Sequence, residues 1–110
     1  MTTEFGVFMK NQMRAIHPGE VLKEEYLVPL GLSVNALAKA LHVTPSRIND
    51  IVLCRRGVSP DTALRLARYF GGDAQSWLNL QQSYDLKVAE QSMLKTILKT
   101  VMPMGSVALA

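Results

Sequence analysis

Apolar residues recur at helical spacing in five successive segments of the chain, and turn-forming residues separate the segments. Three segments begin with the same signal, a proline at the first helical position, where its missing N–H costs nothing: His17-Pro18, Thr44-Pro45 and Ser59-Pro60. No alternating pattern of strand type interrupts them. The sequence therefore predicts an all-α protein of five short helices.

Turn residues set the ends of these helices. Pro29 and Gly31 end the first helix, Ser33 caps the second, and Gly71-Gly72 ends the fourth. The predicted helices cover residues 18–30, 34–42, 45–54, 60–70 and, from Asp73 or Ala74, about 74–88.

The apolar face of each helix defines a predicted core. Trp77 is expected to anchor the fifth helix on the first and fourth, because burial of a bulky aromatic side chain is strongly stabilising. Arg65 and Arg68 are expected to face outward, and Cys54 to be a small, partly buried residue. The apolar residues at helical spacing are Val21, Leu22, Tyr26, Leu30, Leu37, Ala38, Leu41, Ile48, Ile51, Val52, Ala63, Leu64, Leu66, Ala67, Phe70, Trp77, Leu78, Leu80, Tyr84, Leu86 and Val88.

The two ends of the chain fall outside the five-helix pattern. Residues 1–16 lack helical periodicity and predict a flexible N-terminal arm, ahead of a helical domain at 17–91. Residues 92–110 form a C-terminal extension, of which 106–110 are expected to be disordered. An apolar stripe in the extension predicts a sixth helix or a continuation of the fifth, and it either closes a dimer or covers the domain's own core. The stripe consists of Met93, Leu94, Ile97, Leu98 and Val101.

The second and third helices are separated only by a tight turn around His42-Val43, which is the arrangement of a helix-turn-helix. Ala38 is small where the third helix crosses the second, and Ile48 and Ile51 are expected to lock the crossing. His42 stands where such motifs usually carry glycine, so a positive φ is expected there.

The remaining face of the third helix is polar and suits the major groove of DNA, which admits one α-helix. Ser46, Arg47, Asn49 and Asp50 are the candidates for base contacts. Asn49 can pair with an adenine edge, and Arg47 can reach guanine. The candidates for phosphate contacts are Lys39, Thr44, Arg55 and Arg56.

Charge is unevenly distributed along the chain. The formal net charge of +3 is weak evidence for a nucleic-acid partner. Between residues 39 and 68, however, six basic residues against two acidic ones give a local charge of +4. Residues 18–32 hold Glu20, Glu24 and Glu25 against Lys23, for a local charge of −2. The two regions therefore suit two different partners, and the three glutamates are candidates for contact with a basic protein.

Several classes of protein are disfavoured. A chain of 110 residues with 48% hydrophobic and 19% charged residues predicts one folded domain, and no stretch is apolar for long enough to span a membrane. A single cysteine and no signal-peptide pattern predict a cytoplasmic protein. His17, His42 and Cys54 lack metal-ligand spacing, and no nucleophile has a matching base, so we expect no metal, no cofactor and no enzyme activity.

The run from His17 to about Leu86 resembles the HigA/VapI-type antitoxins, a branch of the Xre/Cro-like helix-turn-helix regulators, whose fold is of the lambda-repressor-like type. The resemblance rests on His17-Pro18-Gly19-Glu20-Val21-Leu22, Leu37-Ala38, Asn49-Asp50-Ile51, Arg56-Gly57-Val58-Ser59, Ala63-Leu64-Arg65-Leu66-Ala67, Trp77-Leu78-Asn79-Leu80-Gln81 and Tyr84-Asp85-Leu86.

This resemblance implies a homodimer that binds a palindromic operator of double-stranded DNA in its own promoter. It also implies that the protein silences a HigB-type toxin, a small basic ribonuclease, and that a folded domain makes that contact. Tyr84 and Leu86 either pack within the chain or make the dimer contact; we favour the dimer contact, since one helix-turn-helix rarely offers enough contacts for tight binding. Two alternatives stay open: a stand-alone Xre-type regulator without a toxin, and a protein-interaction module that has lost DNA binding.

Overall fold

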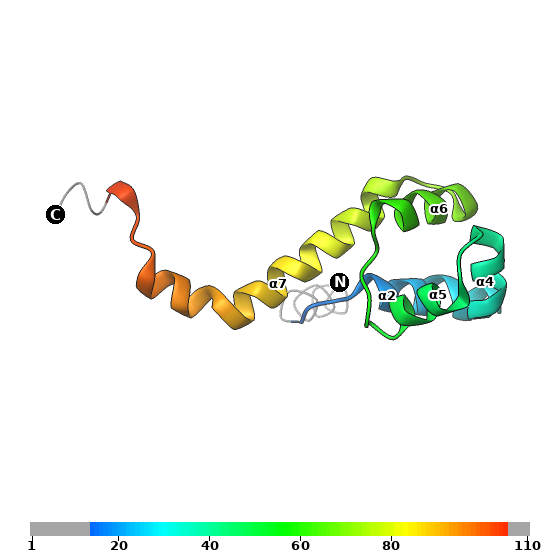
Figure 1. Cartoon of the computed structure of the whole chain (residues 1–110), viewed down its shortest axis with the longest axis horizontal. Helices are drawn as coiled ribbons and strands as arrows, with labels where there is room; N and C mark the ends of the chain where they lie inside the picture. The colour runs from blue at the N-terminus through cyan, green and yellow to red at the C-terminus, as the bar shows by residue number, and fades with distance from the viewer. Residues whose placement is uncertain (1–13, 106–110) are drawn as a thin grey trace, which may run out of the picture.

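The computed structural model describes residues 14–105, which are helical and contain no strand, as the sequence predicts (Figure 1). Residues 1–13 of the predicted arm and the predicted disordered segment 106–110 lie outside the described residues. The elements are α2 (Pro18–Val21), the π-helix η1 (Leu22–Leu27), α3 (Val28–Leu30), α4 (Val34–Leu41), α5 (Pro45–Val52), α6 (Pro60–Phe70) and α7 (Ala74–Thr100).

The first predicted helix is one continuous helical run, α2–η1–α3, with a widened turn that the sequence did not predict. Within it the Val28 N–H donates to the Lys23 carbonyl, five residues back instead of four. The proline ring of Pro29 would press on the carbonyl of Glu25 in a regular α-helix, and the widened turn accommodates it. Gly31, at φ 60°, ends the run in the left-handed region.

The predicted helix starts are confirmed by hydrogen bonds. The hydroxyl groups of Ser33, Thr44 and Ser59 each accept from the backbone N–H three residues further on, at 3.0 to 3.3 Å. Asp73 caps α7 in the same way, with 2.7 Å between its Oδ1 and the Ser76 nitrogen. These caps satisfy N–H groups that have no partner within the helix, and so fix where each helix begins.

One hydrophobic core joins the first helical run to α4, α5, α6 and α7. Trp77 is buried in it as predicted, with its ring 5.4 Å from that of Tyr26, which in turn lies 4.5 Å from Phe70. The first, fourth and fifth predicted helices therefore meet at an aromatic cluster. The buried apolar residues are Leu22, Leu27, Leu37, Ala38, Leu41, Ile48, Ile51, Val58, Ala63, Leu66 and Trp77.

Some apolar residues predicted to face the core do not. Leu64 is 64% exposed, because the buried side of α6 carries Ala63 and Leu66, and Leu64 lies on the opposite side of the helix. Leu30 is exposed at the end of the first helical run. Cys54 is exposed and not partly buried, because α5 already ends at Val52 and leaves Cys54 in the following turn.

Helix α7 is continuous, so residues 92–100 extend the fifth predicted helix and do not form a sixth. Its first turns pack on α6 and α2, and its C-terminal half projects away from the other helices (Figure 1). Every residue from 91 to 105 is exposed. No helix within residues 14–105 combines the length and apolar character that a membrane crossing requires.

Candidate nucleic-acid interface

Helices α4 and α5 form the predicted helix-turn-helix. They pack across the fully buried Ala38, and the Val43 N–H donates to the Ala38 carbonyl at 3.0 Å, which closes the turn. His42 has φ 59°, so the positive φ expected at this position is confirmed. Ile48 and Ile51 are fully buried on the inner side of α5.

The inner side of α5 also rests on the first helical run. A Cβ at position 19 would collide with the Ile51 carbonyl, so only glycine permits this approach of α2 and α5. His17 precedes it, is buried, and accepts the Gly19 N–H through Nδ1 at 2.9 Å. Burial lowers the pKa of the His17 imidazole, against the opposing charges of Asp85 and Glu20. The first helical run therefore supports the inner side of α5 and fixes its position.

All four candidate base-contact residues lie on α5, on the side away from this support. Ser46 and Asn49 are exposed, and Arg47 and Asp50 are half-buried. The Arg47 guanidinium is bound to the Asp61 carboxylate at the start of α6, with 2.7 Å between Nη1 and Oδ2. Asp50 and Arg55 form an ion pair of 3.3 Å.

The candidate phosphate contacts surround α5. Lys39 is exposed on α4, and Thr44 caps the start of α5, with its hydroxyl 3.2 Å from that of Ser46. Arg55 and Arg56 follow the end of α5, and their N–H groups both donate to the Asp50 carbonyl, at 2.8 and 3.1 Å. The turn after α5 is therefore fixed to the helix, and it presents both arginines to solvent.

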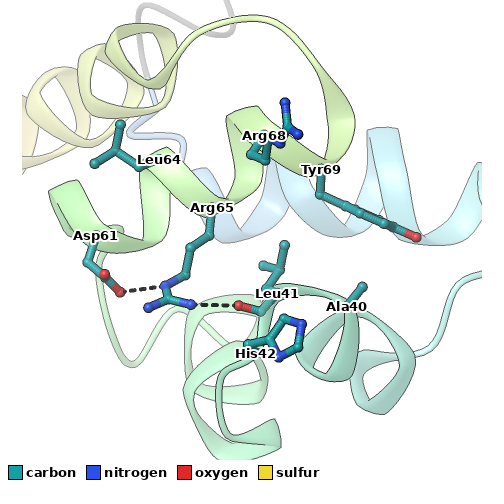
Figure 2. Close-up of a pocket in the computed structure, with 8 residues that line it drawn as sticks. All are labelled: Ala40, Leu41, His42, Asp61, Leu64, Arg65, Arg68 and Tyr69. Carbon is teal, nitrogen blue, oxygen red and sulfur yellow. Dashed lines mark hydrogen bonds and ion pairs between the residues drawn. The ribbon is translucent and has the colours of Figure 1, made fainter.

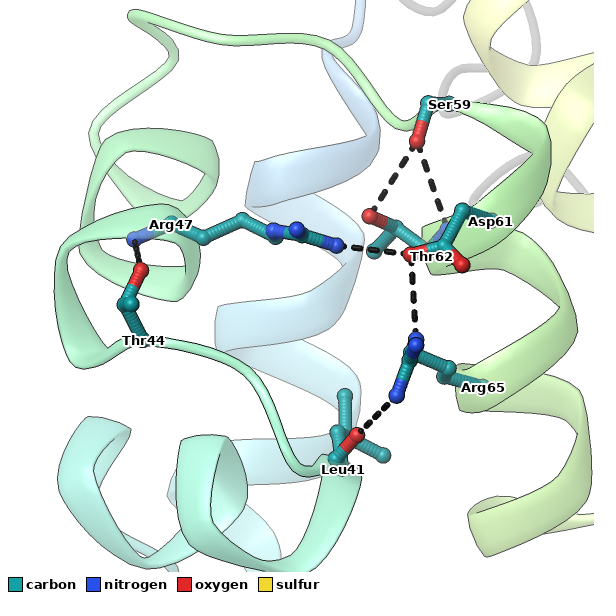
Figure 3. A network of polar contacts seen from close by, with 7 residues as sticks. All are labelled: Leu41, Thr44, Arg47, Ser59, Asp61, Thr62 and Arg65. Atoms are coloured by element: carbon teal, nitrogen blue, oxygen red, sulfur yellow. Dashed lines mark hydrogen bonds and ion pairs between the residues drawn. The ribbon is translucent and has the colours of Figure 1, made fainter.

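A polar network that the sequence did not predict joins α5 to α6 (Figure 3). Asp61 accepts from Arg47 at 2.7 Å and from Arg65 at 3.0 Å, and Arg65 also donates to the Leu41 carbonyl at 2.8 Å. Hydrogen bonds from Arg65 and Arg47 lower the pKa of the Asp61 carboxyl, which keeps it ionised. The i,i+4 spacing of Asp61 and Arg65 is a sequence signal for an ion pair within one helix, whereas no spacing in the sequence indicates the contact of Asp61 with Arg47.

Two neighbouring hollows share Asp61 and Arg65. The larger, of about 610 Å³, lies between the end of α4 and α6; Figure 2 shows Arg65 crossing it from Asp61 to Leu41. The smaller, of about 500 Å³, opens beside α5 and is lined by Arg47, Arg56, Gly57, Ser59, Asp61, Thr62 and Arg65.

The loop between α5 and α6 is tied to α7 by Gln81. Its Oε1 accepts the buried Val58 N–H at 2.8 Å, and its Nε2 donates to Asp85 at 2.9 Å. A Cβ at Gly57 would lie 2.8 Å from the Gln81 side chain, so glycine leaves room for this contact. Gln81 therefore connects the long helix to the loop that carries Arg56.

The candidate toxin-contact glutamates lie on the first helical run. Glu20 forms a bidentate ion pair with Arg14, at 2.8 and 3.1 Å, which lowers the pKa of its carboxyl. Glu24 and Glu25 are exposed on η1. Tyr84, a candidate dimer contact, lies with its ring 4.8 Å from that of His17, whereas Leu86 is exposed.

Within residues 14–105, no three histidine, cysteine, aspartate or glutamate side chains are placed to hold a metal ion. His17, His42 and Cys54 occupy separate sites: a buried helix cap, an interhelical turn and an exposed turn.

Comparisons with known proteins match this architecture. The helix-turn-helix family matches residues 22–77, a range that begins and ends at buried core residues, Leu22 and Trp77. Virulence-associated protein I of Dichelobacter nodosus is 65% identical over 97 residues, which is 88% of each chain. The chain belongs to the HigA/VapI-type branch of the helix-turn-helix family.

Two further relatives agree with this assignment. Antitoxin HigA-1 of Vibrio cholerae is 35% identical over 78 residues, covering 70% of this chain and 72% of its own. A solved structure described as the Pseudomonas aeruginosa antitoxin HigA with higBA promoter superposes with a TM-score of 0.81 and is 46% identical. It covers 83% of this chain and 99% of its own. This branch consists of DNA-binding antitoxins and regulators, which is not a class of enzymes.

Proposed function

We propose that this HigA/VapI-type protein is a sequence-specific DNA-binding antitoxin that represses its own operon and neutralises a HigB-type ribonuclease toxin in the cytoplasm. The observation that carries the proposal is the polar, solvent-facing side of α5, which Arg55 and Arg56 flank. The close approach of α2 at Gly19 supports the opposite side of this helix. The Pseudomonas aeruginosa antitoxin HigA, solved with promoter DNA, supports it through its similarity in fold and sequence.

In this proposal the four polar residues on the solvent-facing side of α5 read bases. Asn49 pairs with an adenine edge, Arg47 with guanine, and Asp50 accepts from a cytosine amino group, while Ser46 contacts either a base or a phosphate. Lys39, Thr44, Arg55 and Arg56 hold the backbone and supply the salt-dependent part of the affinity.

Paired substitutions separate these roles. Asn49→Ala is expected to weaken binding to the protein's own promoter by about 1–3 kcal/mol and to relax sequence choice at one base pair. Arg55→Ala is expected to weaken promoter and random duplexes alike and to flatten the salt dependence. Fluorescence anisotropy over a salt titration measures both. Asn79→Ala, at an exposed position of α7, is the matched control. Equal losses on both duplexes for both variants would contradict the assignment.

A homodimer places two α5 helices on one operator, about one helical turn of DNA apart. The apolar stripe of α7 supports dimerisation, because Met93, Ile97 and Leu98 are exposed and lie outside the core that residues 14–105 form. Leu86 lies on the same side of α7 as this stripe and is also exposed, so we include it in the dimer surface. Tyr84 contributes less, since one side of its ring is already occupied by His17.

The acidic side of η1 suits a basic toxin. Glu24 and Glu25 are exposed, and no partner for either is found among residues 14–105, whereas Glu20 is already bound to Arg14. Charge reversal, Glu24→Lys with Glu25→Lys, is expected to lower the affinity for the protein encoded next to this gene by at least tenfold. Unchanged affinity in a pull-down titration would place the toxin contact elsewhere, and failure of that neighbour to co-purify would favour a stand-alone regulator.

A further inference from the structure

The hollow between α5 and α6 carries more positive charge than its one carboxylate can balance. Three arginines line it, Arg47, Arg56 and Arg65, against the single acid Asp61, for a local charge of three minus one, or +2. Arg56 has no ion-pair partner among the described residues, while Asp61 is shared between the other two arginines. Such an excess in a concave surface attracts an anion.

The position of the hollow indicates which anion it would meet. It borders α5, which is the helix that the proposed function inserts into the major groove, and phosphates line both sides of that groove. A phosphodiester presents two terminal oxygens in a geometry that guanidinium groups bind well, as the two oxygens of a carboxylate do. Asp61 therefore resembles a phosphate in both charge and contacts.

We propose that this hollow binds one backbone phosphate of duplex DNA. Without DNA, the Asp61 carboxylate forms ion pairs with Arg47 and Arg65, and the phosphate displaces it from them. The proposal rests on the proposed function and adds Asp61 and Arg65 to the residues that serve it. Displacement of Asp61 releases Arg47 toward the base edges, while Arg65 and Arg56 remain beside the phosphate.

The strengths of the contacts favour this exchange. The Asp61 side chain is 55% exposed, and ion pairs between exposed groups are weak. Arg65 keeps its place without Asp61, because it also donates to the Leu41 carbonyl at the end of α4 (Figure 3). Arg47 has no other side-chain partner within the described part of the chain, so its position depends on Asp61.

The first test is Asp61→Asn, which keeps the size of the side chain and removes its charge. We expect binding to a random-sequence 30-base-pair duplex to strengthen at least threefold more than in the matched control Asp73→Asn. That control removes the same charge at the cap of α7. We also expect the plot of log affinity against log salt concentration to become steeper by about one unit. Identical behaviour of the two variants would overturn the proposal.

The second test is Arg65→Gln, made in the natural protein and in the Asp61→Asn background. If Arg65 contacts a phosphate, it lowers the affinity in both backgrounds and reduces the salt slope by about one unit. If Arg65 only holds Asp61, the substitution has no effect once the carboxylate is gone, and the proposal fails. Should Arg65→Gln unfold the protein, the comparison of Asp61→Asn with Asp73→Asn decides the proposal on its own.

The two proposals fail in different ways. A natural protein that binds promoter and random duplexes equally would contradict sequence-specific repression, yet the Asp61 and Arg65 tests on random duplex would still decide the phosphate site. If the natural protein prefers its promoter, but Asp61→Asn and Asp73→Asn bind the random duplex with the same affinity, sequence-specific repression still holds and the phosphate site is overturned.

Discussion

Residues 22–77 and the C-terminal half of α7 use apolar residues in opposite ways. In the first region the large side chains of each helix meet one another, and Leu22, Leu37, Ile48 and Leu66 are fully buried. In the second, the apolar stripe is as regular, but Leu98 is 68% exposed and no residue from 91 to 105 is buried.

The same helical spacing of apolar residues thus builds a core in one region and leaves an exposed surface in the other. The helix-turn-helix region buries its apolar surface within the chain, so its fold and the orientation of α5 are set by the monomer. The stripe on α7 has no partner among residues 14–105, and an exposed apolar helix face of this kind is typical of an interface. Substitutions in the first region should therefore affect stability, and substitutions in the second should affect assembly.

The largest expected effect is at the core of the first region. Ile48→Ala removes a fully buried side chain between α4 and α5 and should lower the free energy of unfolding by about 2–5 kcal/mol. Urea denaturation at low protein concentration measures it. Leu98→Ala, in the projecting half of α7, is the matched control and should change monomer stability little. Equal losses in the two variants would remove the contrast between the regions.

The second region is tested by assembly. Ile97→Glu puts a carboxylate into the apolar stripe and should raise the dimer dissociation constant about 100-fold, because burial of an unpaired charge costs a few kcal/mol. Sedimentation velocity over a concentration series gives the constant. Ser92→Glu, on the opposite side of α7, should leave it unchanged. A dimer that tolerates Ile97→Glu would show that the stripe is not the contact.

The connection between the two regions is expected to have a smaller effect. Gln81→Ala leaves the buried Val58 N–H without an acceptor and should lower the free energy of unfolding by about 1–3 kcal/mol. Thermal unfolding compares it with Gln82→Ala, whose side chain is exposed. A loss no greater than that of the control would mean that α7 does not hold the loop after α5.

The smallest effect concerns pH. Burial lowers the pKa of His17 below its ordinary value of 6.5, so the unfolded chain takes up a proton first as pH falls. Stability should therefore decrease as pH falls below about 6.5 and level off below the folded pKa. Carboxyl groups titrate at lower pH. His17→Asn, which keeps a capping side chain, should make stability flatter between pH 7 and 5; an unchanged slope would exclude His17 as the cause.

The features that the sequence predicted well depend on residues that are close together in the chain. Ser33, Thr44 and Ser59 mark helix starts because a cap and its partner lie three residues apart. His42 takes its positive φ in the short turn that links α4 to α5. Trp77 is buried because few positions can hold so large a side chain.

The features that the sequence did not predict depend on contacts between residues far apart in the chain, or on which side of a helix is buried. The pairing of Arg47 with Asp61 spans fourteen positions and depends on how the fold places the start of α6 beside α5. Leu64 was expected inside because it is apolar, but only one side of α6 meets the core. The single long α7 was left open because periodicity continues equally well across one helix or two.

In the proposed complex, the exposed side of α5 enters the major groove of the protein's own promoter, once in each half of a dimer. Cys54 is the only cysteine of the chain and is exposed just beyond α5, so an iron chelate attached to its thiol cuts DNA close to that helix. The claim predicts two clusters of cuts on the promoter duplex, about one helical turn apart. Cuts scattered evenly along the duplex, or no cuts while the protein is bound, would contradict it.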